Sequence, residues 1–229
     1  MTLSGMEAVV MAAGEGRRLR PLTERYAKPV LPIDGRPVIV GVLHELRRAG
    51  IERITVVTGH LAEQVEGLVA GFPAELRFVR QPEALGGADA VRRAALPPPY
   101  VVVGADTKFA AGDVAGFLER AVAFDNAVAV RAKPEAPSRD RIEVEDERVL
   151  RFDNDDPGDP TTGAPLWFLG PTAHRHLETL SGPPFELKEA LERAQKEGAS
   201  TGAIRIGPTR DLTDPFDLVV ENFGYLRRT

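Results

Sequence analysis

Short apolar runs alternate with amphipathic stretches over the first half of the chain. The apolar runs are rich in valine and almost uninterrupted by polar residues, which is typical of strands buried on both faces. They predict five strands, at Glu7–Ala12, Arg53–Thr58, Leu76–Arg80, Tyr100–Val103 and Ala127–Arg131. In the gaps, apolar residues recur at helical spacing and predict helices at Val38–Ala49, Leu61–Ala70, Ala88–Leu96 and Val114–Phe124. This alternation predicts an α/β fold with a doubly wound, mostly parallel, Rossmann-like sheet.

The pattern changes after residue 132. Two short apolar runs, Ile142–Val144 and Val149–Phe152, flank a polar turn and predict a β-hairpin. The polar segment Asp153–Thr162 predicts a loop. The remaining predicted elements are a strand at Leu166–Leu169, a helix at Glu186–Glu197, a strand at Ala203–Ile206 and a helix at Phe216–Leu226. No repeat or long linker divides the chain, so we expect one domain over residues 1–229, whose second half adds antiparallel strands and a lid on the substrate side.

Composition and charge narrow the class of protein. Cysteine is absent, which excludes disulfides and thiolate chemistry. No apolar run approaches the ~18 residues that a membrane span needs, and no leader-like pattern opens the chain, so we expect a cytoplasmic protein without a membrane partner. A net charge of −5 without a long basic run argues against nucleic-acid binding, so an anionic ligand must be held by a local site. The cationic side chains are 24 arginines and only five lysines, and each lysine therefore merits inspection.

A glycine-rich loop follows the first predicted strand. Ala13-Gly14-Glu15-Gly16-Arg17-Arg18 would lie at the carboxyl edge of the sheet, where α/β proteins bind ligands. Glycines let backbone N–H groups approach phosphate oxygens, and a flanking arginine adds charged donors. The loop is not a Walker motif and lacks the third glycine of a dinucleotide fingerprint. Taken alone, it predicts either a phosphate-binding loop or a tight turn with solvated arginines.

The stretch from Ala12 to Ile39 resembles the signature of the sugar-1-phosphate nucleotidylyltransferases. The glycine loop continues into Pro21-Leu22-Thr23, followed by a Lys28-Pro29 segment and a Gly35-Arg36-Pro37 helix start. The resemblance implies transfer of a nucleotide from a nucleoside triphosphate to a sugar 1-phosphate, with pyrophosphate released and Mg²⁺ as cofactor. It also implies a nucleotide-binding part at about residues 1–110 and a sugar-binding part at about 111–229, and it leaves open whether the protein forms a homo-oligomer.

The resemblance also assigns roles to individual residues. The nucleotide-binding residues it implies are Ala13, Gly14, Gly16, Arg18, Gln81 and Gly86, with Gln81 pairing with a pyrimidine and so favouring dTTP or UTP. The catalytic residues it implies are Arg18, Lys28 and Asp106. Asp106 and Asp211 would hold Mg²⁺, while Gly163, in a turn before the Leu166–Leu169 strand, and Glu186 would contact the sugar. The alternatives are that Asp106 and Asp211 only shape turns and that Glu186 only begins a helix.

Three departures from the family pattern keep other functions open. Gly87 stands where the family usually has threonine, and Thr213 where it usually has glycine. Asp153-Asn154-Asp155-Asp156-Pro157 stands where many members carry Glu-Lys-Pro, whose lysine meets the sugar phosphate. The acceptor could therefore be a non-sugar alcohol phosphate, or the protein could be a catalytically silent, nucleotide-binding regulatory subunit. Retention of Arg18, Lys28, Asp106 and Asp211 together favours an enzyme.

Overall fold

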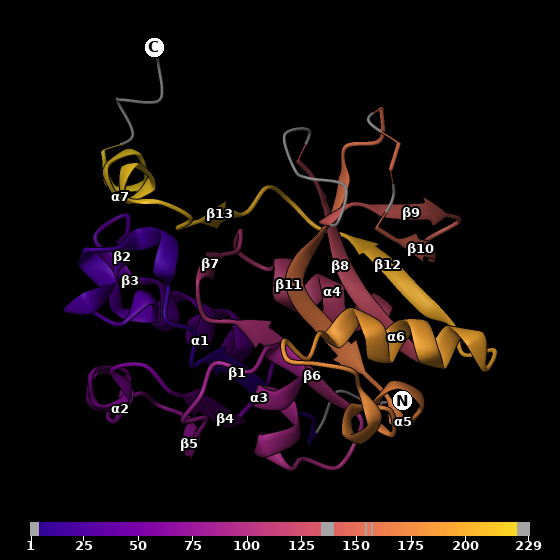
Figure 1. Ribbon diagram of the computed structural model, residues 1–229, viewed down its shortest axis with the longest axis horizontal. Coiled ribbons are helices and arrows are strands. Elements are labelled where there is room, and N and C mark those ends of the chain that lie inside the picture. The colour runs from indigo at the N-terminus through magenta and orange to yellow at the C-terminus, as the bar shows by residue number, and fades with distance from the viewer. Residues whose placement is uncertain (1–4, 134–139, 154, 157, 224–229) are drawn as a thin grey trace.

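The computed structural model describes residues 5–133, 140–153, 155–156 and 158–223 (Figure 1). Nine strands of the described chain form one sheet. From edge to edge they are β5 (Glu75–Arg80), β4 (Arg53–Thr58), β1 (Glu7–Ala12), β6 (Tyr100–Gly104), β11 (Thr161–Leu169), β8 (Asn126–Ala132), β12 (Thr201–Arg205), β10 (Arg148–Phe152) and β9 (Ile142–Glu145). β5, β4, β1 and β6 are parallel, and so are β8 and β12, whereas β11 runs antiparallel between β6 and β8. The predicted α/β sheet, mostly parallel with added antiparallel strands, is confirmed.

Helices cover both faces of this sheet because neighbouring strand residues point to opposite sides. Val10 of β1 packs in one apolar cluster with α1 (Val38–Arg48), α2 (Ala62–Val69) and α4 (Asp113–Ala121). Its neighbour Val9 packs in the other cluster, with α3 (Gly87–Ala94), α5 (Pro171–His174) and α6 (Leu187–Lys196). Val9 and Val10 are both completely buried, as the uninterrupted valine runs predicted. No helix in the part of the chain that the structure describes has the length and apolarity to cross a membrane.

One strand of the second half is longer than predicted. β11 begins at Thr161, so the end of the predicted Asp153–Thr162 loop is strand instead. Thr161 and Thr162 are polar, but they are buried and pair with the end of β8, which explains why their polarity misled the prediction. The pairing shifts register between Gly163 and Trp167, where Pro165 has no N–H to donate.

The last helix lies away from the core. α7 (Pro215–Asn222) begins at a capping box formed by Asp214 and Asp217 and ends before Phe223, and the rest of the predicted helix, to Leu226, lies outside the described residues. The apolar residues that recur at helical spacing in this segment are largely exposed: the exposed fractions of Phe216, Val219 and Phe223 are 70%, 41% and 50%. Apolar burial therefore contributes little to holding α7 in place.

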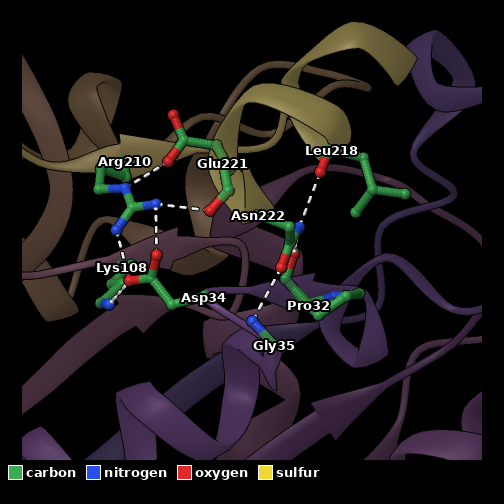
Figure 2. Close-up of polar contacts among 8 residues, drawn as sticks. All are labelled: Pro32, Asp34, Gly35, Lys108, Arg210, Leu218, Glu221 and Asn222. Atoms are coloured by element: carbon green, nitrogen blue, oxygen red, sulfur yellow. Dashed lines mark hydrogen bonds and ion pairs between the residues drawn. The ribbon is translucent and has the colours of Figure 1, made fainter. Parts of the chain in front are cut away.

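Polar contacts hold α7 instead (Figure 2). The guanidinium of Arg210 binds the carboxylates of Asp34 and Glu221, and Lys108 also binds Asp34. The side chain of Asn222 donates to the carbonyl of Pro32 and accepts the N–H of Gly35. We call these contacts the clasp. It joins the hairpin of β2 (Pro32–Ile33) and β3 (Arg36–Pro37) to α7 and to the paired strands β7 (Thr107–Lys108) and β13 (Arg210–Asp211).

Candidate active site

A cleft of about 590 Å³ lies at the carboxyl ends of the parallel strands. Its lining includes Met11 of β1, Asp106 just after β6, Arg131 of β8 and Gly163 near the start of β11. All four positions lie at the same edge of the sheet, because β11 runs opposite to its neighbours and so begins where they end. This is the edge at which open α/β sheets bind their ligands.

The glycine loop turns sharply at Gly16. The backbone of Gly16 is left-handed, with φ of 61°, and a Cβ atom there would lie 2.9 Å from the methyl group of Thr23. The Thr23 hydroxyl donates to the Gly16 carbonyl at 2.9 Å and fixes the turn. A side chain at Gly16 would therefore meet both backbone strain and a clash.

The two arginines after this turn have different surroundings. Arg17 forms an exposed ion pair with Glu15 at 2.8 Å, whereas Arg18 lines the cleft. Ala13 is buried and Gly14 is exposed, and neither of these predicted nucleotide-binding residues is part of the cleft lining. Their roles stay predictions, while Arg18 is in a position to meet an anion.

Lys28 and Asp106, separated by 78 positions in the chain, meet in the cleft. Lys28 begins a short 3₁₀ turn, Lys28–Val30, that Pro29 stiffens, and its ammonium binds the Asp106 carboxylate. The Lys28 side chain is 14% exposed and the Asp106 side chain 40% exposed. The pair is thus accessible from the cleft, and an incoming anion can replace the carboxylate as the partner of Lys28.

Asp211 is held more tightly than Asp106. The pairing of β13 with β7 places Asp211 opposite Thr107, whose hydroxyl donates to one carboxylate oxygen at 2.7 Å. Arg131 lies 2.8 Å and Lys133 3.6 Å from the other oxygen. Burial by itself would raise the pKa of Asp211, but the positive charge of Arg131 and the Thr107 hydrogen bond hold that pKa below its usual value.

The residues predicted to recognise the base lie beside the cleft lining. Gln81 is only 4% exposed, and its amide nitrogen donates to Asp89 at 2.8 Å and to the Gly86 carbonyl at 3.2 Å. Because a carboxylate only accepts, Asp89 fixes which way the Gln81 amide faces and leaves the amide oxygen for a ligand. A Cβ atom on Gly86, whose φ is 108°, would lie 2.4 Å from the Phe185 carbonyl oxygen, so the packing of this turn is itself a reason for glycine at this position. Their roles toward a nucleobase stay predictions.

Both residues predicted to contact the sugar line the cleft. Gly163 does so from within β11, paired with Val130, so the prediction that it lies in a turn before the strand is wrong. The register shift beside it supplies the irregular backbone that the sequence suggested as a turn. Glu186 is the N-cap residue of α6, and its side chain makes no capping hydrogen bond. Its carboxylate is therefore not committed to the helix that it begins.

Several cleft residues escaped the sequence prediction. Chief among them are Arg131, Lys133, Arg141, Trp167 and Lys188. Three of the five lysines of the chain line this one cleft, so the scarcity of lysine was the signal that could have found two of these residues. Among the residues that the structure describes, six cationic and four acidic side chains line the cleft, an excess of two positive charges in a chain of net charge −5. The cleft is suited to anions that the protein as a whole would repel.

Comparison with known proteins agrees with this geometry. The family model described as nucleotidyl transferase matches residues 7–153. The chain is 46% identical over 67 residues to a 2-aminoethylphosphonate cytidylyltransferase from Lancefieldella rimae, covering 29% of this chain and 27% of that protein. It is 24% identical over 233 residues to the bifunctional protein GlmU of Methanococcus maripaludis, covering 97% of this chain and 55% of that protein. The chain thus spans about half the length of these relatives or less.

A solved structure supports the fold. A Bacillus anthracis protein named "putative glucose-1-phosphate thymidylyltransferase" matches with a TM-score of 0.84 at 18% sequence identity. The match covers 98% of this chain and 96% of that one. Nearly the whole chain therefore shares one architecture with that protein.

Proposed function

Because this chain belongs to the nucleotidyl transferase family, we propose that it transfers the nucleotidyl group of a nucleoside triphosphate to the phosphate of an acceptor, with a sugar 1-phosphate as the first candidate. The observation that carries the proposal is the meeting of Lys28 and Asp106 beside Arg18 in one cationic cleft. The family predicted from the first loop is confirmed, and the substrates are the part that we propose.

The proposed reaction forms one O–P bond and breaks another. An oxygen of the acceptor phosphate attacks the α-phosphorus, and a new O–P bond forms. The bond from the α-phosphorus to the bridging oxygen of the β-phosphate breaks, and that oxygen keeps the electron pair as pyrophosphate leaves. The attacking oxygen is already anionic, so no base has to remove a proton from it. What the protein must supply is alignment and neutralisation of negative charge.

The cleft residues suit that task. The turn at Gly16 and the Arg18 side chain would hold the β- and γ-phosphates, and Arg18 would then hold the leaving pyrophosphate. Lys28 would leave Asp106 and neutralise oxygens of the α-phosphate and of the incoming acceptor. Charges fixed in place before the reaction stabilise a transition state without further reorganisation.

We propose a pyrimidine nucleotide, dTTP or UTP, as the donor. The support is Gln81, whose amide nitrogen is bound to Asp89 and whose amide oxygen is left as an acceptor. The N3–H group of uracil or thymine is a donor that such an oxygen can bind. A buried polar site rejects a base that leaves its groups unpaired, often by several kcal/mol.

The residues present fit a magnesium ion that enters with the triphosphate. Mg²⁺ is usually held by one or two carboxylates together with phosphate oxygens and water. Asp106 offers a carboxylate that is open to the cleft, and β13 brings Asp211 beside the neighbouring Thr107. Among the described residues, no group of three or more histidine or acidic side chains forms a site complete in itself, in keeping with an ion that shares its ligands with substrate. When bound, the ion would supply charge neutralisation at the phosphates.

Asp106→Asn tests this metal role. Asparagine keeps the shape of the side chain but loses its charge, so we expect Mg²⁺ binding in the presence of triphosphate to weaken at least ~10-fold and turnover to fall by orders of magnitude. The melting temperature should change little, because the asparagine oxygen can still accept a hydrogen bond from Lys28. Calorimetric titration of Mg²⁺ measures the first effect directly. Unaltered Mg²⁺ affinity and turnover in this variant would remove Asp106 from the mechanism.

One observation favours a second class of acceptor. The segment that begins at Asp153 carries no lysine where the family resemblance places one, and a relative that is 46% identical over 67 residues is named for a phosphonate substrate. A non-sugar phosphate or phosphonate therefore remains the second candidate acceptor.

A screen of triphosphates against acceptors tests the proposed function. Each pair is incubated with the protein and pyrophosphatase, and the phosphate released is measured with malachite green. We expect release only when both substrates are present, with dTTP and UTP above ATP and GTP. A clear preference for a purine triphosphate would overturn the pyrimidine assignment, and no release with any pair would contradict nucleotidyl transfer.

A further inference from the structure

Two groups of cations line the cleft, and they come from different parts of the sheet. Arg18 and Lys28 follow β1, whereas Arg131 and Lys133 lie at the end of β8 and Lys188 in the first turn of α6. β8 is three strands from β1 in the sheet order, which at the usual strand spacing is roughly 14 Å. Because the first group would bind the triphosphate, the second group is positioned for a second anion.

Within the second group, Lys188 is the cation whose carboxylate partner lies outside the cleft lining. Arg131 is only 11% exposed and lies against Asp211, whose carboxylate Lys133 shares. Lys188 instead binds both oxygens of Asp153, at 2.7 and 2.8 Å. The side chains of Lys188 and Asp153 are 36% and 46% exposed, and Asp153 is not part of the cleft lining. An exposed ion pair contributes little to stability, so an anion in the cleft can replace Asp153 at low cost.

The position of Lys188 in the first turn of its helix also favours a bound anion. The N-terminus of a helix carries a partial positive charge, so a lysine in the first turn of α6 is repelled by it. Glu186 does not cap this end with its side chain, and Glu189, in the same turn, is bound to Arg193 at 2.6 Å. Asp153 is the carboxylate that compensates Lys188 in the structure. A substrate anion at this position would supply the same compensation.

We propose that Lys188 binds the phosphate or phosphonate group of the acceptor in exchange for Asp153, an assignment that rests on the nucleotidyl transfer proposed above. The family resemblance places a lysine in the segment that begins at Asp153, and this chain has no lysine there. α6 instead brings the ammonium of Lys188 to Asp153. The ligand is a dianionic phosphate monoester or phosphonate, carried by a sugar or by a short alkyl chain. Glu186, two residues before Lys188, lines the same cleft and can accept a hydrogen bond from a hydroxyl or ammonium group of that ligand.

Lys188→Met tests the assignment, because methionine keeps an unbranched apolar side chain and removes the charge. We expect the KM of the acceptor to rise about 10- to 100-fold, while the nucleotide KM stays unchanged and kcat changes less than about threefold. Lys196→Met is the matched control: Lys196 lies in the last turn of the same helix, is exposed and does not line the cleft. It should leave both KM values as in the wild type.

Asp153→Asn should act in the opposite direction. Without the competing carboxylate the acceptor KM should fall a few-fold, an improvement that loss of a merely structural ion pair would not produce. Glucose 1-phosphate and 2-aminoethylphosphonate, used as separate acceptors, distinguish a sugar from an alkyl carrier of the same anionic group. The acceptor that the wild type uses should be the one whose KM these variants change.

Different experimental results would overturn the role of Lys188 and the nucleotidyl transfer. Wild-type protein that releases pyrophosphate, together with a Lys188→Met variant of unaltered acceptor KM, overturns the role of Lys188 and leaves nucleotidyl transfer standing. Wild-type protein that transfers to no acceptor overturns nucleotidyl transfer itself, and the Lys188 assignment with it. An equal rise of acceptor and nucleotide KM in Lys188→Met would show a structural role and would also overturn the assignment.

Discussion

The two walls of the cleft are built in opposite ways. The wall that we assign to the nucleotide takes Arg18 and Lys28 from one continuous stretch, which also carries the turn at Gly16, and its acidic residue Asp106 from elsewhere. The wall that we assign to the acceptor takes two to four residues from each of several separate stretches, among them Arg131 with Lys133, Thr162–Pro165, Glu186–Lys188 and Asp211–Thr213. We refer to them below as the nucleotide wall and the acceptor wall.

The charges of the two walls also differ in how they are held. Arg18 is exposed, and the pair of Lys28 with Asp106 is open to the cleft. On the acceptor wall, the partner of Arg131 is Asp211, whose side chain is only 18% exposed, against 40% for Asp106. A continuous, open loop brings its donors to one ligand, which we assign as the triphosphate. A wall assembled from scattered positions can change one residue at a time, so the acceptor can vary while the chemistry at the triphosphate stays the same.

The largest effect is expected on the nucleotide wall, at Lys28. Lys28→Ala should lower kcat by about 10²–10³-fold, because a fixed ammonium is most valuable where two anions close on each other. The nucleotide Kd should change much less, since the loop and Arg18 remain. Single-turnover kinetics and calorimetry separate the two quantities.

Lys28→Arg is the control for this prediction. A planar guanidinium cannot take the place of a compact ammonium, so arginine should not restore turnover. If Lys28→Ala loses nucleotide binding and turnover in equal measure, Lys28 is a ground-state clamp and its role in the transition state is wrong.

On the acceptor wall the next largest effect should be on stability. Arg131→Met should lower the free energy of unfolding by about 2–3 kcal/mol, because it leaves the buried Asp211 carboxylate with only the Thr107 hydroxyl and the more distant Lys133. Adding Asp211→Asn should recover part of the loss, since the only cation it leaves without this carboxylate is Lys133, which is 35% exposed. Urea denaturation measures both.

Arg18→Met is the matched comparison on the nucleotide wall. Arg18 is exposed, so we expect its loss to change the free energy of unfolding by less than about 0.5 kcal/mol. Equal stability losses at Arg18 and Arg131 would erase the contrast between the two walls.

The smallest effect is expected at the clasp, which ties the segment after Lys28 to the arm that carries Asp211. Hydrogen bonds from Arg210 and Lys108 lower the pKa of Asp34, so its stabilising contribution is present above the unfolded-state pKa of about 4 and is lost as the pH falls through the lower folded-state pKa. Asp34→Asn should cost about 0.5–1 kcal/mol near pH 7, a small figure because Asp34 is half exposed and screened by salt. Denaturation at pH 7 and pH 3 should show this difference shrinking in acid; a difference that grows in acid would contradict the clasp.

Much of the fold was predictable because its signals are local. β1 and β4 have the predicted bounds, since a run of buried valines marks a strand without help from distant residues. β2, β3, β7 and β13 have two residues each and were not predicted, because so short a strand has no periodicity of its own. β11 was cut short in the prediction because its first threonines are buried by a neighbouring strand that the sequence pattern does not reveal.

The residues of the candidate site were likewise predictable where their sequence signals are local. Arg18, Lys28 and Asp106 were predicted and lie together in the cleft, because the motifs that carry them are compact. Arg131 and Lys188 were not, because each is a single cation in an otherwise ordinary strand or helix. Only the fold shows that both line the same cleft.

Direct transfer of the nucleotidyl group to the acceptor is the central claim, and a label on the α-phosphate tests it. The wild-type protein is incubated with α-³²P-labelled UTP or dTTP and the acceptor found in the screen, and the labelled products are separated. The account predicts that the label appears in a product joined to the acceptor phosphate, in amounts equal to the pyrophosphate released, and only when acceptor is present. Label recovered as nucleoside monophosphate, or left in the triphosphate whatever the acceptor, would contradict it.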